Sequence, residues 1–97
     1  MSQLSSCNPL VSIVIPTYNR AFCIDRVISS VINQTLTDWE LIVVDNNSTD
    51  NTEEVINDFL DERISIVKIQ NDGIVAKSRN LGIKLANGTF VAFLDSD

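Results

Sequence analysis

Four short apolar runs, which recur at intervals of about 25 to 30 residues, constrain most strongly what this chain can fold into. They occupy residues 11–15, 41–44, 64–69 and 90–94, and they are rich in β-branched or aromatic side chains. The first, second and fourth runs are nearly continuous in apolarity, which is typical of strands in a sheet covered on both faces. The spacing suits strand–helix–strand units, so we interpret the four runs as strands.

Between these runs, apolar residues recur with the period of an α-helix. A spacing of i, i+3, i+4, i+7 and i+8 predicts an apolar stripe on the first helix. A second helix is expected to begin near Asp50 or Thr52, and a third to extend from about Gly73 to Ala86, where Asn87-Gly88 supplies a left-handed stop. The stripe of the first helix is Ile24, Val27, Ile28, Val31 and Ile32, and the buried face of the second is expected to be Val55, Ile56, Phe59 and Leu60.

The alternation of strand and helix patterns predicts an α/β protein. The order β-α-β-α-β-α-β favours a three-layer fold with an open, mainly parallel sheet and right-handed crossover helices. A chain of 97 residues suffices for one small domain and not for two. We expect residues 1–9 to be flexible, and the pattern alone leaves the strand order open.

The composition excludes several classes of protein. A net charge of −6 argues against a general nucleic-acid binder and provides no polybasic anchor for an anionic membrane. No apolar run approaches the roughly 20 residues of a transmembrane helix, and residues 1–8 lack the pattern of a signal peptide. Two cysteines form no disulfide framework, and without a histidine neither has a partner base for catalysis. We expect a cytoplasmic location, with peripheral attachment of a larger protein to the inner face of a membrane left open.

Polar or special residues follow every expected strand, at 16–20, 45–50, 70–73 and 95–97. Because the carboxyl ends of parallel strands meet at one edge of a sheet, these residues are expected to converge there, and this edge is where α/β proteins bind ligands. Tyr18 offers a ring on which a base can stack, or packs locally within its loop. Asp45 accepts hydrogen bonds from a nucleotide, or caps the loop that follows it.

Two carboxylates, Asp95 and Asp97, end the sequence. Residues i and i+2 of an extended chain point the same way, so these carboxylates repel each other unless a cation lies between them. Hard divalent cations prefer such oxygen ligands, although a polar loop after an edge strand has the same composition. Lys77 and Arg79 are expected near the same edge, where they can meet a phosphate, whereas Gly73 either approaches an anion or makes a turn.

Taken together, these residues resemble the N-terminal half of a family 2 glycosyltransferase with the GT-A fold. The similarity extends from about Pro9 to Asp97. It is carried by six segments in a specific order, namely 11–20, 30–35, 39–45, 47–52, 76–82 and 93–97.

The resemblance implies a strand order of 3-2-1-4 and a site for a nucleotide-diphosphate sugar, with a uridine donor favoured. It also implies Mn²⁺ or Mg²⁺ as the metal and transfer with inversion, metal-assisted, to an unknown acceptor such as a glycan or a lipid-linked molecule. Pro16, Thr17 and Tyr18 would line the nucleoside pocket, and Asp45 and the residue after it would contact the base. The nucleotide-binding residues are expected to be Pro16, Thr17, Tyr18, Asn19, Asp45, Asn46, Lys77 and Asp95, and the metal ligands Asp95 and Asp97.

Asn46 departs from the family pattern, because many members carry a second acid there. An amide both donates and accepts, so the contact with a uracil N–H loses its charge assistance. No residue is assigned as general base, which the resemblance places beyond Asp97. We therefore expect the chain to hold part of a donor site, to be inactive in transfer by itself, and to self-associate through the edge of strand 90–94.

Two rival classes share the α/β pattern. A non-catalytic nucleotide-binding or receiver-like module needs acids after the first strand, yet none follows that strand before Asp25. A nucleotidyltransferase usually carries a glycine-rich basic loop there, and residues 16–23 contain no glycine.

Overall fold

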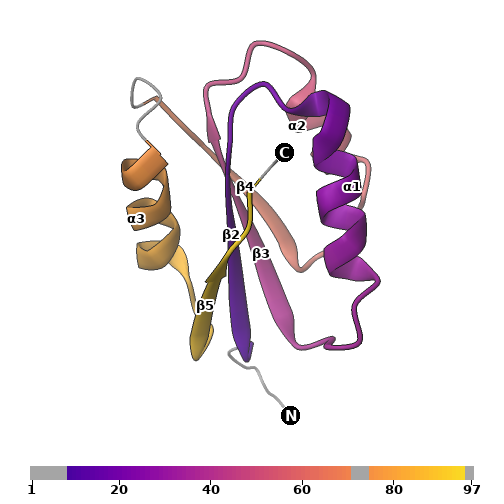
Figure 1. The fold of residues 1–97 in the computed structure, drawn as a ribbon, viewed down its shortest axis with the longest axis vertical. Coiled ribbons are helices and arrows are strands. Elements are labelled where there is room, and N and C mark those ends of the chain that lie inside the picture. The colour runs from indigo at the N-terminus through magenta and orange to yellow at the C-terminus, as the bar shows by residue number, and fades with distance from the viewer. Residues whose placement is uncertain (1–8, 71–74, 96–97) are drawn as a thin grey trace.

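The computed structural model describes residues 9–70 and 75–95. Strands and helices alternate along these residues (Figure 1). In chain order they are β2 (Val11–Thr17), α1 (Ala21–Ile32), β3 (Trp39–Asn46), α2 (Thr52–Asn57), β4 (Ile64–Ile69), α3 (Val75–Leu85) and β5 (Phe90–Phe93). The expected flexibility of the first nine residues concerns positions that lie, apart from Pro9, outside the described part of the chain.

The strands form one sheet with the order β4-β3-β2-β5, and each neighbouring pair is parallel. In chain order this is 3-2-1-4, so the expected fold class and strand order are confirmed. The register pairs Thr17 with Asp45 at one end of β2 and Val11 with Trp39 at the other. The carboxyl ends of β2 and β3 are therefore level with each other.

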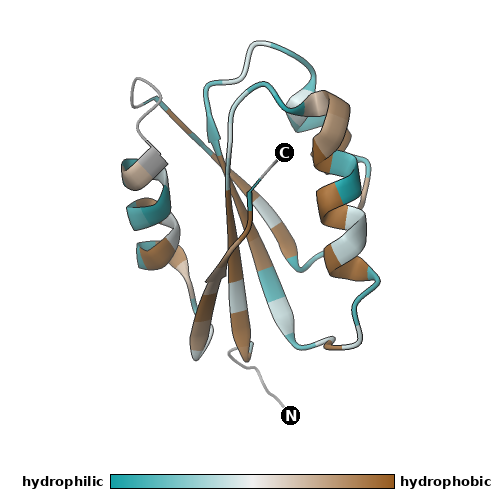
Figure 2. Cartoon of the chain, in the orientation of Figure 1, coloured by the Kyte–Doolittle hydropathy of each residue, from teal (hydrophilic) through white to brown (hydrophobic). Residues whose placement is uncertain are grey.

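The sheet lies between two helical layers (Figure 1). Alternate residues of β2 and β3, such as Ile15 and Val43, pack with α1 and α2. The residues between them, such as Val14 and Val44, pack on the opposite face with Leu81 of α3. Figure 2 shows hydrophobic residues along the strands and hydrophilic residues in the loops that follow β2 and β3. The core thus fixes the strands and leaves their polar exits at one edge.

The first helix buries the apolar stripe that its sequence predicts, with Ile24 and Ile28 fully inaccessible. The second helix is shorter than its apolar pattern suggests. Ile56 is buried, but α2 ends at Asn57 and Leu60 lies beyond it, 91% exposed with φ 51°. The expectation that Leu60 belongs to the buried face is therefore wrong, because the chain leaves the helix before that position.

Strand β5 differs from the other nearly continuous apolar runs, because it is exposed along its whole length. It pairs with β2 on one side and is the last strand of the sheet among the described residues. Helix α3 packs mainly over β2 and β3. The expectation that a helical layer covers β5 on both faces is thus wrong, whereas its expected place at the edge is confirmed.

A hydrogen-bonded cluster joins β2, β3 and the turn before β5 at the amino edge of the sheet. The buried Ser12 hydroxyl donates to Glu40 Oε2 at 2.5 Å and accepts from the backbone N–H of Gly88 at 2.7 Å. The backbone N–H of Asn87 donates to Glu40 Oε2 at 2.6 Å. The turn that enters β5 is therefore fixed at this edge, which leaves the opposite edge for a ligand.

Candidate functional site

The candidate site lies at the carboxyl edge of β2, β3 and β5. Thr17 and Asp45 are register partners at the ends of two neighbouring strands. On the other side of β2, the backbone N–H of Leu94 donates to the Val14 oxygen at 3.1 Å, and Asp95 follows directly. The sheet therefore brings the residues expected at 16–19, 45–46 and 95 to one edge, as their order predicts.

Tyr18 and Asp45 occupy different depths of this edge. The Tyr18 residue is 53% exposed, so its ring is accessible to a flat ligand, whereas Asp45 is 1% exposed. Pro16 is half-buried, and Thr17 after it is buried. An exposed aromatic ring and a buried carboxylate at the same edge of the sheet suit stacking on a base and accepting its hydrogen bond.

Asp45 also performs the structural role that its sequence suggests. The Ser48 hydroxyl donates a hydrogen bond to Asp45 Oδ1 and so closes the loop after β3. Asp45 Oδ2 remains the second acceptor of the same carboxylate. Both interpretations of Asp45, loop cap and ligand contact, are therefore compatible with this geometry. Asn46, the last residue of β3, is 8% exposed.

The loop after β2 is bound to the loop after β3 through Asn19. The backbone N–H of Asn19 donates to Ser48 Oγ at 2.9 Å. Its side-chain Oδ1 accepts from the backbone N–H groups of Thr49 at 2.7 Å and Asp50 at 3.3 Å. We call these four residues, Asn19, Ser48, Thr49 and Asp50, the loop clasp.

Asp50 joins the beginnings of two helices. Its Oδ2 accepts from the N–H of Ala21, the first residue of α1, at 3.2 Å. Its Oδ1 accepts from the N–H of Thr52, the first residue of α2, at 3.1 Å and from the Thr52 hydroxyl. These hydrogen bonds, that of the Thr52 hydroxyl first, hold the pKa of Asp50 below its usual value against the opposing effect of burial.

Replacing Asp50 by alanine is expected to lower the free energy of unfolding at pH 7 by about 1 kcal/mol, the usual effect of losing a helix cap. Because the folded-state pKa is depressed, this stabilisation is complete above the unfolded value of 3.8 and is lost as pH falls through the folded value. Urea unfolding between pH 7 and pH 2, followed by Trp39 fluorescence, should show a flatter pH dependence in the variant. Asp58→Ala, an exposed acid at the other end of α2, is the control, and an unchanged slope in Asp50→Ala would contradict the assignment.

Asp95 lies two residues beyond the end of β5, and its side chain is 81% exposed. Arg79 Nη2 is 4.0 Å from Asp95 Oδ1, and the Arg79 guanidinium lies 5.6 Å from the centre of the Phe93 ring. Lys77 is exposed in the first half of α3. Two basic side chains thus lie on α3, and one of them, Arg79, reaches Asp95.

Two elements of the expected site fall on residues that the structure does not describe. Asp97, the expected metal ligand, lies outside the described ranges, as does Gly73, the expected turn or anion contact. Within residues 9–70 and 75–95, no three His, Cys, Asp or Glu residues form a cluster that could hold a metal ion. The described donors at the edge, Asp45 and Asp95, offer only oxygen atoms, which suits a hard divalent cation rather than a soft one.

Sequence reasoning missed the loop clasp. Asn19 was expected at the nucleotide, and Asp50 was expected only as a helix start. The signal available in the sequence is the run Asn47-Ser48-Thr49-Asp50, whose side chains favour local backbone hydrogen bonds. Nothing in that run specifies that its partner lies in the loop after β2.

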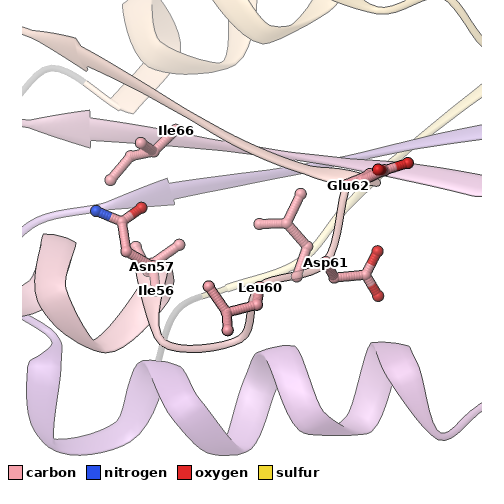
Figure 3. A pocket seen from close by; sticks show the side chains of 7 residues that line it. Ile56, Asn57, Leu60, Asp61, Glu62 and Ile66 are labelled. Carbon is pink, nitrogen blue, oxygen red and sulfur yellow. The ribbon is translucent and has the colours of Figure 1, made fainter.

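A pocket of about 270 Å³ between α2 and β4 is not part of this site (Figure 3). Asp61 in its wall is already paired with Arg63, Nη2 to Oδ2, at 2.7 Å. None of the expected site residues lines it. Its lining consists of Ile56, Asn57, Leu60, Asp61, Glu62, Ile64 and Ile66.

A parallel sheet with helices on both faces, and with an aromatic ring, amides and carboxylates at its carboxyl edge, defines the chain as an open α/β protein of the kind that binds ligands at that edge. The sequence profile described as "Glycosyl transferase family 2" matches residues 12–97. The chain belongs to this family, so the resemblance seen in the sequence is confirmed.

Relatives and solved structures agree with this family. The Escherichia coli protein "UDP-Glc:alpha-D-GlcNAc-diphosphoundecaprenol beta-1,3-glucosyltransferase WfgD" is 46% identical over 91% of this chain and 35% of its own length. Staphylococcus aureus TarS 1–349 superposes with a TM-score of 0.85 at 33% identity, over 91% of this chain and 27% of that one. The Pyrobaculum calidifontis mannosyltransferase PcManGT was solved with GDP-Man and Mn²⁺. It superposes with a TM-score of 0.82 at 26% identity, over 95% of this chain and 28% of that one.

The chain spans only 35% and 38% of the lengths of two curated relatives that it matches. Among the described residues, no helix combines the length and the apolar character required to cross a bilayer. The fold and the family of this chain are thus established. The activity of a protein with the full length of these relatives is a proposal.

Proposed function

We propose that this chain forms the donor-binding part of a glycosyltransferase that uses a nucleotide-diphosphate sugar, with a uridine donor favoured. The observation that carries the proposal is the pairing of Thr17 with Asp45, which puts the exposed Tyr18 ring and a buried carboxylate at one edge of the sheet. Asp95 follows β5, the neighbour of β2 on its other side. The nucleoside would then meet Tyr18 and Asp45, and the diphosphate would meet Asp95 further along the same edge.

The nucleoside would be held by the ends of β2 and β3. Tyr18 would stack on the base, and Asp45 and Asn46 would contact its polar edge. Thr17 and Pro16 would line the same pocket. The Thr17 hydroxyl is buried and has no hydrogen-bond partner among the described residues, which is consistent with a group that a ligand satisfies.

The diphosphate would lie towards β5 and α3. Asp95 and Asp97 would hold Mn²⁺ or Mg²⁺, and Lys77 would contact a phosphate. Such a cation, when bound, stabilises the negative charge that develops on a leaving diphosphate. Asp95 is suitably exposed for a site that also contains water and phosphate oxygens, as magnesium sites usually do.

Solved relatives support the donor class and leave its base open. TarS has been solved in complex with UDP, and it is 31% identical to this chain in that structure. Glucosyl-3-phosphoglycerate synthase from Mycobacterium tuberculosis contains Mn²⁺ and UDP, whereas PcManGT contains GDP-Man and Mn²⁺. Because Asn46 replaces an acid common in the family, the uridine preference depends mainly on Asp45.

Transfer would proceed with inversion to an unknown acceptor, a glycan, a lipid-linked molecule or another hydroxyl compound. Inversion needs a general base to deprotonate the acceptor hydroxyl, and we assign none to these 97 residues. We propose that the base and the acceptor-binding residues belong to the part of the relatives' length that this chain does not span. The chain by itself would bind donor weakly and transfer no sugar, and we propose a cytoplasmic location for it.

Calorimetric titration of the 97-residue chain tests donor binding. UDP is expected to bind at least about tenfold more tightly with Mn²⁺ than with EDTA, because one charge-assisted contact contributes that much. Uridine without phosphates should show no metal dependence. Absence of heat with UDP and Mn²⁺ in a folded sample would reject the proposal.

We also propose that the chain self-associates through β5. Its outer edge lacks a neighbouring strand among the described residues, and Phe90 and Phe93 are 62% and 41% exposed. An apolar groove of about 320 Å³ beside it is lined in part by Ala92 and Leu94. Pairing with a second copy would satisfy the edge and cover these side chains.

Light scattering coupled to size exclusion is expected to show a molar mass that rises with concentration. Phe90→Lys should return the chain to a monomer, because a charge on an edge strand opposes pairing. Leu60→Lys, at an exposed position beside β4 at the other edge of the sheet, is the control. A monomer at all concentrations would end this proposal without affecting the donor site.

A further inference from the structure

Tyr18 lies between two residues that the structure holds firmly. Thr17, before it, is the last residue of β2, is buried, and pairs with Asp45. Asn19, after it, is bound to the loop after β3. The Tyr18 backbone is therefore anchored on both sides, although its side chain is exposed.

Asn19 suits this anchoring role in two ways. Its φ of 50° lies in the left-handed region, which asparagine adopts more readily than most residues. Its Oδ1 accepts from the N–H groups of Thr49 and Asp50, so the side-chain oxygen is already used within the protein. The Asn19 side-chain oxygen thus serves the loop clasp and does not face a ligand as a spare acceptor.

The clasp also connects Tyr18 to Asp45. The Ser48 hydroxyl accepts from the backbone N–H of Asn19 at 2.9 Å and donates to the carboxylate of Asp45. The Ser48 side chain therefore links the loop that carries the ring to the carboxylate of Asp45. This link fixes the backbone next to Tyr18 relative to Asp45.

We propose that Asn19 is a positioning residue, which fixes the backbone that carries the Tyr18 ring at the edge where Asp45 lies, through the loop clasp, and does not itself contact the nucleotide. The part of this inference that concerns the nucleotide rests on the proposed function. Without the clasp, the Tyr18 backbone would have to be ordered when ligand binds. Ordering one residue weakens binding by about tenfold.

The composition of the chain provides two separate reporters for a test. It contains one tyrosine, Tyr18, and one tryptophan, Trp39. A 3-fluorotyrosine label therefore gives a single ¹⁹F signal from the site. Trp39, 2% exposed at the amino edge, reports global folding.

The first measurement needs no ligand. In Asn19→Ala, the ¹⁹F signal is expected to move towards that of the unfolded chain and to relax as a more mobile group, while Trp39 fluorescence stays native. Asn19→Asp keeps the acceptor and tolerates the left-handed backbone, so it should retain the wild-type signal. Ile28→Val, which removes one methyl group from the buried face of α1, controls for a general loss of stability. An unchanged ¹⁹F signal in Asn19→Ala would overturn the inference.

The second measurement is a double-mutant cycle on UDP affinity in the presence of Mn²⁺. Asn19→Ala is expected to weaken binding about tenfold in the wild-type background. In a Tyr18→Ala background the same change should weaken it less than about twofold, because the residue it positions is absent. Equal losses in both backgrounds would mean that Asn19 contacts the nucleotide itself. If wild type does not bind UDP, the proposed function fails, and the ¹⁹F result still decides whether Asn19 holds Tyr18.

Discussion

Replacing Gly82 by alanine is expected to destabilise the protein by about 2 to 3 kcal/mol, as overpacking of a well-filled core does. A Cβ at this position would be 2.3 Å from Val14 Cγ1 and 2.9 Å from Val14 Cγ2. Val14 is fully buried in the centre of β2, so it has no free space into which to move. The helix would have to shift away from the sheet at Gly82, where α3 lies against Val14 of β2.

The sign of this effect separates packing from helix propensity. In an exposed helix interior, glycine to alanine stabilises by about 0.5 to 1 kcal/mol, because alanine loses less backbone entropy. Urea unfolding should therefore show a lower free energy of unfolding for Gly82→Ala than for wild type. In a Val14→Ala background, Gly82→Ala should lower the free energy of unfolding by less, because the clashing methyl groups are absent. A variant Gly82→Ala more stable than wild type would show that α3 does not pack on β2 as described.

Replacing Asp45 by asparagine is expected to weaken UDP binding about ten- to hundredfold. The proposed function has the buried carboxylate accept the N3–H of uracil, and hydrogen bonds to charged groups contribute about 1.5 to 3 kcal/mol. Asparagine preserves the shape and still accepts from the Ser48 hydroxyl, so the loop after β3 should remain closed. Asp61→Asn, the same chemical change at the opposite edge, should leave the affinity unaltered.

A comparison of UDP with CDP identifies which part of the nucleotide Asp45 contacts. Uracil presents a donor at N3 and cytosine an acceptor, so the wild-type carboxylate should favour UDP. Asp45→Asn should reduce that preference, since an amide serves both bases. Equal weakening of UDP and CDP would instead place Asp45 at the ribose, and unchanged affinity would remove it from the site.

The sheet and its polar edge were predictable because they follow from periodicities within single segments. Runs 11–15 and 41–44 are continuously apolar, and the stripe that includes Ile24 and Ile28 has helical spacing. Both strands and the helix stripe are buried as expected. The convergence of Tyr18, Asp45 and Asp95 then follows from parallel pairing alone, because every such strand ends at the same edge.

Where sequence reasoning failed, the deciding contact came from elsewhere in the chain. The run at 90–94 resembles a covered strand, yet β5 is exposed because α3 packs over β2 and β3 instead. Leu60 continues an apolar helical pattern, yet α2 has ended three residues earlier at Asn57. In both cases the local pattern correctly indicated an apolar segment. It did not indicate whether another element packs against that segment.

The sequence by itself determined the order of strands and helices, the family and the set of polar residues at the carboxyl edge, because these depend on neighbours a few positions apart. Only the tertiary structure decided that Asn19 binds the Ser48–Asp50 loop, that Asp50 accepts from the first N–H of α1, and that Gly82 lies against Val14. Each of these contacts joins residues about 30 or more positions apart, or two layers of the fold. Their partners are fixed by packing, which no local periodicity encodes.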